Sequence, residues 1–398
     1  MTVDVPSVPT TLNPHTVAGD VAATRDVTEV VLPQVYQVTP GLVPQLDSDV
    51  AQASVQSINP LTVVYQINPN AVWSDGVPIN SQDFVYSWRS QRGDGIDVNG
   101  EPDSVASTAG YRDIASVTGS NDDRTVTVVF KTQFADWPSL FDDLLPAHVG
   151  EVVGWNTGFD QYDPKALVSG GPWQVASWVP GQSMVLERNP RWWGVKPHLD
   201  RIVLRAVPGA DQEVNDVVSG SAQVAQPDGF NGATLAQVSS HPHVESEASI
   251  GTTMLQLELN TRREPLNQIA VRQAIGHAID RGALVTDLIG PMLPEAWVDN
   301  DFLAPNLQSD AYSDDAGSSS SVDEAAVSRL MEQAGLSEDA SHTWTQFGTP
   351  VTLHLTWDAD DPWSQLVGPA LAAQLVSSGF DVSVEPVPTT ELFDATLE

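Results

Sequence analysis

The most informative stretch of the chain is Trp73-Ser-Asp-Gly-Val-Pro-Ile-Asn-Ser-Gln-Asp-Phe84. It places a large aromatic residue before Asp75-Gly76, a pair that is typical of a tight turn. Asn80 then offers a polar N-cap, and the apolar residues after it share one face, so we predict a helix over 80–89. Asp83 falls in the first turn of this helix, where its charge meets the positive end of the helix dipole.

The segments on either side of this helix favour an antiparallel sheet. Residues 54–58, 62–67 and 125–130 alternate apolar and polar side chains, which predicts three strands. Residues 17–36 carry apolar positions at helical spacing, and 140–149 suggest a second, short helix. The early part of the chain therefore mixes a meander of strands with helices.

The pattern changes after residue 165. Strands are predicted at 173–178, 183–188 and 201–206, separated by Pro-Gly and Asn-Pro turns. A helix is predicted at 210–218, where the apolar residues recur at helical spacing before Gly220.

The last part of the chain predicts a different arrangement. We expect a strand at 253–260, a long helix at 269–288, and a strand, a helix and a strand at 351–357, 363–378 and 382–387. A β–α–β unit of this kind implies a parallel pair of strands. The fold class expected for the whole chain is therefore α+β with α/β lobes.

Composition excludes several classes of protein. The chain has 398 residues, with 52 Asp and Glu against 17 Lys and Arg, which gives a net charge of −35. This charge repels nucleic acid and anionic lipid, so we expect neither as a partner. Cysteine is absent, which excludes disulfides and thiolate chemistry. No stretch is apolar enough for a transmembrane helix, and the first residues do not form a signal peptide.

Two acidic motifs are candidates for metal binding. His241-Pro-His-Val-Glu-Ser-Glu247 would place two His and two carboxylates on one face of a strand, a plausible set for Zn²⁺. The four positions span about 20 Å, so only two neighbours could share an ion, and a solvated polar face is the alternative. Asp358-Ala-Asp-Asp361 resembles part of a Ca²⁺ loop but lacks its Gly and late Glu, so we favour a polar N-cap before the next helix.

Catalytic motifs give no support for an enzyme. The chain has no G-x-S-x-G, H-E-x-x-H or P-loop string, and its eight His are scattered. We therefore expect a protein without catalysis, cofactor or resident metal.

Residues 73–84 resemble the signature of family-5 extracellular solute-binding proteins, the oligopeptide- and dipeptide-binding receptors of ABC importers. Further blocks resemble this family in the same order along the chain: Thr11–Pro14, Ser169–Trp173, Leu186–Trp193, Leu259–Leu266 and Val271–Arg281. Gly110–Ile114, Trp137–His148 and the doubled Gly170-Gly171 look closest to an actinobacterial, LpqW-like branch, which is tied to lipoglycan assembly in the cell envelope.

The resemblance implies a periplasmic-binding-protein-like fold of type II, cluster C. Domain I would comprise 1–25 and 166–250, domain II 26–165, and domain III 251–398. Family members usually continue for another hundred-odd residues, so the last domain is expected to be C-terminally incomplete here. Most members carry a lipid anchor on a Cys after the leader, and we expect both to be absent from this chain.

The main functional hypothesis from this resemblance is an extracytoplasmic receptor. It would bind a peptide or similar solute between lobes and deliver it to ABC permease subunits in the membrane, acting as a monomer. Hinges are expected at Thr11–Pro14 and Ser169–Pro172. The residues expected to line the binding cleft are His15, Thr16, Trp173 and Asn260, with Tyr111, Trp357 and Trp363 as further candidates.

Two other hypotheses remain at this point. The first is an LpqW-like regulatory envelope protein, which would act in lipoglycan and cell-wall assembly through protein contacts without transporting a solute. The second is a metal-dependent hydrolase that uses His241–Glu247, which the presence of stoichiometric Zn²⁺ would distinguish.

Overall fold

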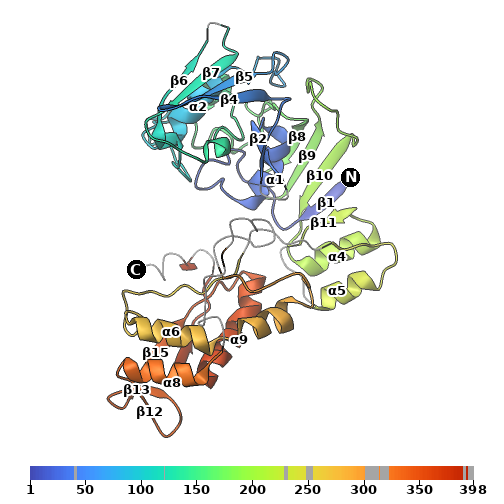
Figure 1. Ribbon diagram of the computed structural model, residues 1–398. Coiled ribbons are helices and arrows are strands. Elements are labelled where there is room, and N and C mark those ends of the chain that lie inside the picture. The colour runs from blue at the N-terminus through green and yellow to red at the C-terminus, as the bar shows by residue number, and fades with distance from the viewer. Residues whose placement is uncertain are drawn as a thin grey trace. The chain divides into compact units, whose positions relative to one another are not determined.

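The computed structural model describes residues 1–39, 43–120, 122–227, 232–247, 254–300, 313, 322–388 and 391–392. The chain divides into two compact units, unit 1 at Met1–Pro227 and unit 2 at Asp228–Glu398. Figure 1 shows that strands dominate the first unit and helices the second.

One sheet of unit 1 brings the N-terminus next to residues from 170 onward. Its order is β11-β1-β10-β9-β8, and β1 is parallel to both of its neighbours. The strands are β1 (Thr2–Val5), β8 (Trp173–Val179), β9 (Ser183–Arg188), β10 (Arg201–Ala206) and β11 (Val224–Ala225). Helix α4 (Ala210–Ser219) follows β10 and ends at Gly220, as predicted.

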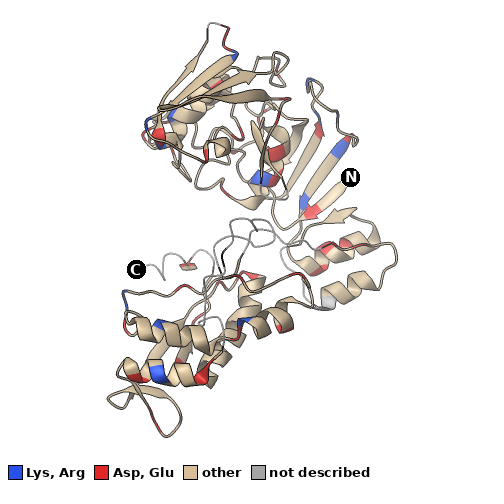
Figure 2. Cartoon of the chain, in the orientation of Figure 1, with Lys and Arg blue, Asp and Glu red and all other residues tan. Residues whose placement is uncertain are grey.

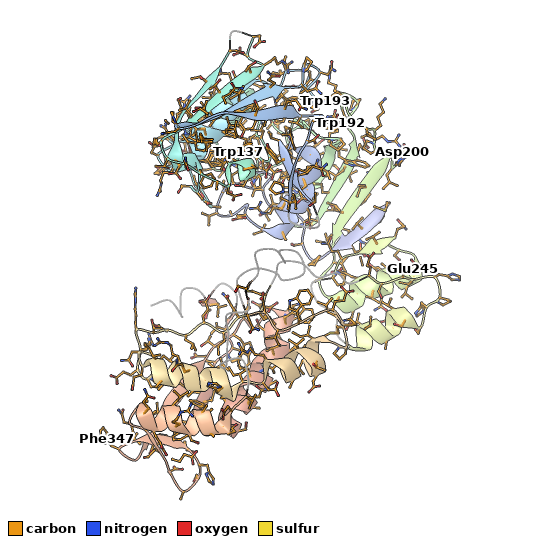
Figure 3. The ribbon with its side chains drawn as sticks, viewed as in Figure 1. Trp137, Trp192, Trp193, Asp200, Glu245 and Phe347 are labelled. Atoms are coloured by element: carbon orange, nitrogen blue, oxygen red, sulfur yellow. The ribbon has the colours of Figure 1, made fainter. Side chains whose placement is uncertain are left out.

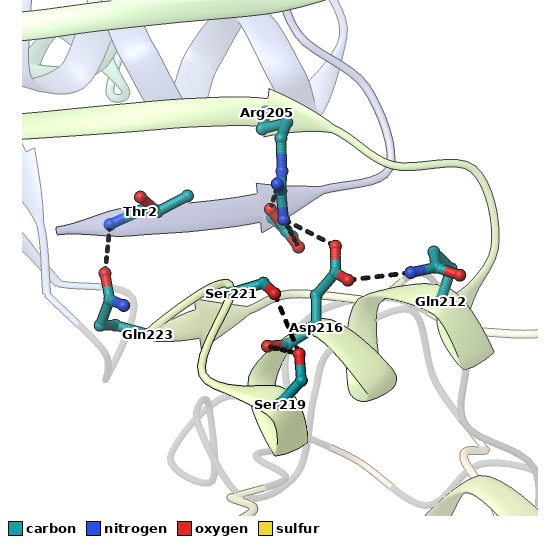
Figure 4. A network of polar contacts seen from close by, with 8 residues as sticks. Thr2, Arg205, Gln212, Asp216, Ser219, Ser221 and Gln223 are labelled. Carbon is teal, nitrogen blue, oxygen red and sulfur yellow. Dashed lines mark hydrogen bonds and ion pairs between the residues drawn. The ribbon is translucent and has the colours of Figure 1, made fainter.

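A network of charged side chains links this sheet to α4 (Figure 4). Asp4 is fully buried on β1, and Arg205 of β10 donates Nε–H and Nη2–H to its two oxygens, each over 2.8 Å. Arg205 also contacts Asp216 of α4 at 2.6 Å. The burial of Asp4 requires this guanidinium, because an unpaired buried carboxylate is costly.

The second sheet of unit 1 is the predicted antiparallel meander. Its order is β4-β5-β7-β6, with β4 (Ala51–Ile58), β5 (Leu61–Ile67), β6 (Ile114–Gly119) and β7 (Thr125–Phe130). Strand β7 alternates half-buried and buried side chains, which confirms the period-two prediction. Helix α2 (Ser81–Gln91) packs on β6 and β7 (Figure 1). A short hairpin, β2 (Tyr36–Val38) and β3 (Pro44–Leu46), completes the strands described in this unit.

The stretch 73–84 has the structure that its residues predict. Gly76 N–H donates to the Trp73 carbonyl at 2.8 Å, and the positive φ of 96° at Gly76 explains the glycine. Asn80 and Asp83 form a capping box at the start of α2. Asp83 also accepts from the backbone N–H of Ala147 at 2.8 Å, so this buried carboxylate ties α2 to α3 (Ala147–Val153).

The doubled glycine at 170–171, just before β8 of the first sheet, is bonded to the end of α1 (Ala22–Val31). Both glycine N–H groups donate to the Val31 carbonyl, at 3.0 and 2.9 Å. A Cβ on Gly171 would lie 2.4 Å from the backbone oxygen of Val30, and one on Gly170 would lie 2.8 Å from Pro33. Glycine is required at 171 because the Val30 backbone lies too close for any side chain, and at 170 because the Pro33 ring does.

Unit 2 has its own apolar core between helices and a parallel strand pair. Val271, Ile275, Leu330 and Leu375 are buried in it together. The strands β15 (Thr352–Leu355) and β16 (Asp381–Val384) are parallel and joined through α9 (Pro362–Ser377), as the β–α–β pattern predicts. The other elements described here are α5 (Gly232–Ser239), α6 (Ile269–Ala278), α7 (Arg281–Ala283), η3 (Leu284–Ile289), α8 (Glu324–Gln333), β12 (Ser337–Glu338), β13 (Trp344–Gln346) and β14 (Thr349–Pro350).

Two predicted helices are wrong in extent. The helix predicted at 140–149 begins only at Ala147, because Phe141 and Asp143 have positive φ angles of 64° and 45° that no α-helix tolerates. The long helix at 269–288 breaks after Ala278, where Asp280 leaves the helical region and caps the next turn through Ala283 N–H.

Two predicted strands are also wrong. Residues 254–260 form no strand, although Leu255, Leu257 and Leu259 alternate with polar residues, because no strand of the described chain pairs with them. Residues 241–247 are irregular, and Pro242 removes a backbone donor that a strand would need. Among the described residues, no helix has both the length and the apolar character to cross a membrane.

Candidate functional site

A cavity of about 670 Å³ lies within unit 1. This volume is in the range of pockets that enclose small ligands. The cavity is bounded by the loop after β1, helix α1, hairpin strand β2, the segment 136–143 and the turn at Gly170–Pro172. Two of the family-like blocks, Thr11–Pro14 and Ser169–Trp173, therefore meet at this cavity.

His15 anchors one side of the cavity to the opposite wall. Its ring is stacked on Trp155 with centroids 5.8 Å apart, and its Nε2–H donates to the Asp143 carbonyl over 3.0 Å. Burial lowers the pKa of His15 to about 4, so the ring is neutral near pH 7. Asn13 supports the turn, because its Nδ2–H donates to the Trp155 carbonyl at 2.8 Å.

The segment Leu140–Asp143 is held in an unusual backbone conformation. The Tyr111 hydroxyl accepts the Phe141 N–H at 2.8 Å, and Gln34 donates Nε2–H to Asp143 Oδ1 at 3.3 Å. Positive φ angles at Phe141 and Asp143 persist because these contacts and the burial of Phe141 hold them. The result places Asp142 and Asp143 together at the cavity.

Acidic side chains outnumber basic ones around the cavity. The lining carboxyl groups are Asp20, Glu29, Asp47, Asp136, Asp142 and Asp143. Arg25 is the cationic residue among the lining residues, and it is already paired with Asp20. Figure 2 shows the same excess of acidic over basic positions along the described chain.

Burial changes the protonation of the paired carboxyl groups. Burial, together with the neighbouring charge of Asp143, raises the pKa of Asp142 to about 8. Burial likewise raises the pKa of Asp143 to about 6, against the opposing hydrogen bond from Gln34. The buried Asp142 Oδ1 atom has no hydrogen-bond partner in the described structure. At pH 7 the Asp142 carboxyl group in the cavity wall is therefore mostly protonated.

Aromatic rings complete the wall of the cavity. Tyr36, Tyr111, Phe134 and Trp192 all line it. Trp192 lies beside Trp193 with ring centroids 4.6 Å apart (Figure 3), and Trp193 Nε1–H donates to the Asp49 carbonyl. Large rings of this kind provide contact area to a ligand at low entropic cost.

The predicted site residues fall into three groups. His15 and Tyr111 line the cavity of unit 1. Thr16 and Trp173 also belong to unit 1 but are buried at 2% and 7% exposure and are not part of the lining. Asn260, Trp357 and Trp363 belong to unit 2, where all three are half-buried.

The unit 2 candidates make local contacts that explain their positions. Asn260 Oδ1 accepts the Arg262 N–H at 3.1 Å, and a Cβ on Gly368 of α9 would lie 2.6 Å from the Trp357 ring. Asp361 accepts the Ser364 N–H at 2.7 Å and caps α9, which confirms the N-cap interpretation of residues 358–361. Among the described residues, no three His, Cys, Asp or Glu come together closely enough to hold a metal ion.

Sequence reasoning missed the carboxylates of the cavity. Asp142 and Asp143 lie inside the family-like block Trp137–His148, and the other acids are spread from residue 20 to 136. The only sequence feature that marks these carboxylates is an acidic pair before Leu-Leu-Pro. The burial of this pair depends on contacts with α1 and Gln34, which are distant in sequence.

Residues 45–398 match the family of bacterial extracellular solute-binding proteins, family 5 Middle. The chain belongs to this family. The structure resembles the periplasmic EDTA-binding protein EppA with a TM-score of 0.83 and 26% identity, over 98% of this chain and 74% of that one. It also resembles AppA from Bacillus subtilis, solved with a nonapeptide, with a TM-score of 0.74 and 17% identity, over 99% of this chain and 75% of that one. These matches confirm the type II periplasmic-binding-protein fold.

Two mycobacterial proteins are similar in sequence. The probable monoacyl phosphatidylinositol tetramannoside-binding protein LpqW of Mycobacterium tuberculosis is 29% identical over 83% of this chain and 51% of its own length. The oligopeptide-binding protein OppA of Mycobacterium bovis is 38% identical over 36% of this chain and 24% of its own. The chain thus spans about half the length of LpqW and less of OppA. The predicted LpqW-like actinobacterial relationship is confirmed.

Proposed function

We propose that the protein is an extracytoplasmic solute receptor of an ABC importer and that the cavity of unit 1 forms part of its binding site. The observation that carries this proposal is the cavity of about 670 Å³, bounded by Pro14, His15 and the turn at 170–172 among other segments. Its aromatic rings and backbone groups suit a solute of peptide size. The receptor would hand this solute to membrane permease subunits and work as a monomer without enzymatic activity.

The three-lobe division is part of this proposal. The sheet that joins β1 to β8–β11 supports the assignment of 1–25 and 166–250 to one lobe, with 26–165 and 251–398 as the others. His15 and Tyr111 are proposed as contacts because they line the cavity. Thr16, Trp173, Asn260, Trp357 and Trp363 are proposed on the family resemblance alone, as are the hinges.

Calorimetric titration of the full chain with a pool of free-ended di- to pentapeptides tests the receptor proposal. We expect a saturable heat with the stoichiometry of one site. A folded protein that gives no heat with the pool, or with any fraction of it, would contradict the proposal.

A second candidate function follows from the similarity to LpqW over 83% of the chain. The protein would then regulate envelope lipoglycan assembly through protein contacts. Affinity capture with the tagged full chain distinguishes the two, because permease and ATPase subunits support the receptor and glycosyltransferases support the regulator.

A further inference from the structure

The tip of one loop in unit 1 carries an exposed Asn-Gly dipeptide. Residues 95–103 fold back on themselves as a short hairpin, in which the Asp97 N–H donates to the Glu101 carbonyl at 2.8 Å. Asn99 and Gly100 lie at the tip of this hairpin, and both are exposed. Gly100 has a φ of 88°, as expected for a three-residue hairpin loop that ends in a left-handed residue.

The side chain of Asn99 folds back over the backbone that follows it. Its Oδ1 atom accepts the Glu101 N–H at 3.0 Å, which brings the side-chain amide over the peptide unit of Gly100. When a nucleophile adds to Asn99 Cγ, negative charge develops on Oδ1, and the same N–H group stabilises that charge. Space around the nucleophile is also open, because a Cβ on Gly100 would meet no atom of the described residues within 4 Å beyond its chain neighbours.

One backbone hydrogen bond must open before the Gly100 nitrogen can react. The Gly100 N–H donates to the Asp97 carbonyl at 2.9 Å, so the nitrogen is engaged while the turn is closed. This bond lies at an exposed hairpin tip, where local opening costs much less free energy than global unfolding. We therefore expect the reaction to occur in the folded protein, but more slowly than in an unstructured Asn-Gly peptide.

We propose that Asn99 is a site of spontaneous deamidation, with water as the co-reactant, and that the reaction loosens the contact of this hairpin with Trp155. Asparagine is a chemically labile residue. The Gly100 nitrogen gives its proton to hydroxide and bonds to Asn99 Cγ. The Cγ–Nδ2 bond breaks, and Nδ2 takes a proton from water and leaves as ammonia, which regenerates the hydroxide.

The product of this first step is a five-membered succinimide ring, which then takes up one water molecule. Opening of the ring at Cγ gives an aspartate at position 99. Opening at the backbone carbonyl carbon gives an isoaspartate, whose main chain runs through the former side chain. Neither step changes an oxidation state, so no oxidant or reductant is needed.

The modification reaches the cavity wall through Trp155. Asp97 Oδ1, at the base of the hairpin, accepts the Trp155 N–H at 2.6 Å, and the Trp155 ring is stacked on His15. Isoaspartate adds one methylene group to the main chain of the loop, and either product adds a negative charge close to the carboxylates of Asp97 and Glu101. Both changes disfavour the closed turn and weaken its hold on Trp155.

Peptide mapping by mass spectrometry, after incubation of the full chain in warm alkaline buffer, tests the proposal with Asn70 as internal control. Asn70 is also exposed and occupies the same place in a turn, since the Ala71 N–H donates to the Asn68 carbonyl at 2.9 Å. The Cβ of Ala71, however, crowds the attacking nitrogen, which glycine leaves open. We expect deamidation at Asn99 to be at least about tenfold faster than at Asn70, a difference of about 1.4 kcal/mol in activation free energy.

The products identify the route. Both aspartate and isoaspartate should appear at position 99, because only the succinimide gives the second product. Equal rates at Asn99 and Asn70, or aspartate as the sole product, would overturn the proposal.

Asn99→Gln is the matched variant for the structural effect. Its longer amide would have to close a six-membered ring, so position 99 should stay unmodified over the same incubation. Hydrogen exchange should be faster at the Trp155 amide of the incubated parent chain than before incubation, and unchanged in the incubated variant. Deamidation that leaves this exchange unchanged, or faster exchange in both chains, would contradict the link between Asn99 and Trp155.

Discussion

His15 donates its Nε2–H to the backbone carbonyl of Asp143 over 3.0 Å, across 128 residues of sequence. This bond joins the loop after β1 to the segment that carries the two adjacent carboxyl groups of the cavity. The His15 ring is also stacked on Trp155, so its position is set from two directions. The cavity wall thus depends on one neutral imidazole.

His15→Ala should therefore loosen the wall and lower the free energy of unfolding of unit 1 by about 1–2 kcal/mol, because a partly buried hydrogen bond and a ring contact are lost. Chemical denaturation followed by Trp fluorescence measures the change. His198→Ala is the control, since His198 is exposed and its side chain makes no bond in the described structure. An equal effect of the two variants would contradict this role of His15.

The paired carboxyl groups predict a dependence of stability on pH. Because the folded-state pKa values of Asp142 and Asp143 are raised to about 8 and about 6, the folded state holds more protons than the unfolded state between about pH 4 and pH 8. These two carboxyl groups contribute stability that is lost as pH rises through their folded-state pKa values. His15, whose pKa is lowered to about 4, opposes them below about pH 6.5, so the decrease in stability should be clearest between about pH 6.5 and pH 8. Glu29, whose pKa is also raised by burial and Asp143, adds to the effect, and Arg25 opposes it.

Asp142→Asn removes the largest contributor to this dependence. We expect the variant to melt at a higher temperature than the parent at pH 8 and to show a flatter melting profile between pH 5 and pH 8, because each unit of pKa shift corresponds to about 1.4 kcal/mol. Differential scanning calorimetry of the ligand-free protein measures both. A parent protein whose melting temperature rises steadily across this range would contradict the prediction.

The doubled glycine gives a steric prediction. Gly171→Ala places a Cβ 2.4 Å from the backbone oxygen of Val30, and neither backbone can move without breaking the bonds to Val31. We expect a loss of about 1–3 kcal/mol in unfolding free energy. Gly282→Ala is the control, since its nearest atom is a side-chain oxygen at 3.4 Å. If the Gly171 and Gly282 variants have the same melting temperature, this steric prediction is wrong.

Asp4 and Arg205 provide the last stability prediction. Arg205→Ala leaves a fully buried carboxylate without its two guanidinium bonds, so we expect a loss of about 2 kcal/mol, moderated because Arg205 itself is 39% exposed. Arg188→Ala breaks the pair with Asp200, which is 91% exposed, and two exposed hydrogen bonds to the Leu199 and His198 carbonyls, and should cost about 1 kcal/mol or less. Urea denaturation compares them, and a larger loss at Arg188 would disagree with the account.

The sequence predicts the elements well where local pattern and packing agree. Thr125–Phe130 alternates and is a strand, and the Asn80 cap begins α2 as expected. The prediction fails where tertiary contacts override the pattern, as at Phe141 and Asp143, whose positive φ angles end the helical run. Residues 254–260 alternate without a partner strand, and period alone cannot supply one.

The candidate site was only partly predictable. Its place after the family-like opening block predicts His15, and the branch resemblance predicts Tyr111. Asp142 and Glu29 could not be found, because a carboxylate gives the same sequence signal on a solvated surface as in a cavity wall. Only the folded arrangement of α1 against the segment 136–143 distinguishes the two.

The most direct test of the central claim is the intrinsic fluorescence of the full chain during titration with mixed free-ended peptides. Trp192 lines the cavity, so a bound solute should shift the emission saturably, and Trp192→Phe should reduce the amplitude. Trp344→Phe is the control, because Trp344 is buried in the separate core of unit 2. A flat response from a protein shown to be folded would contradict the claim that this cavity binds a solute.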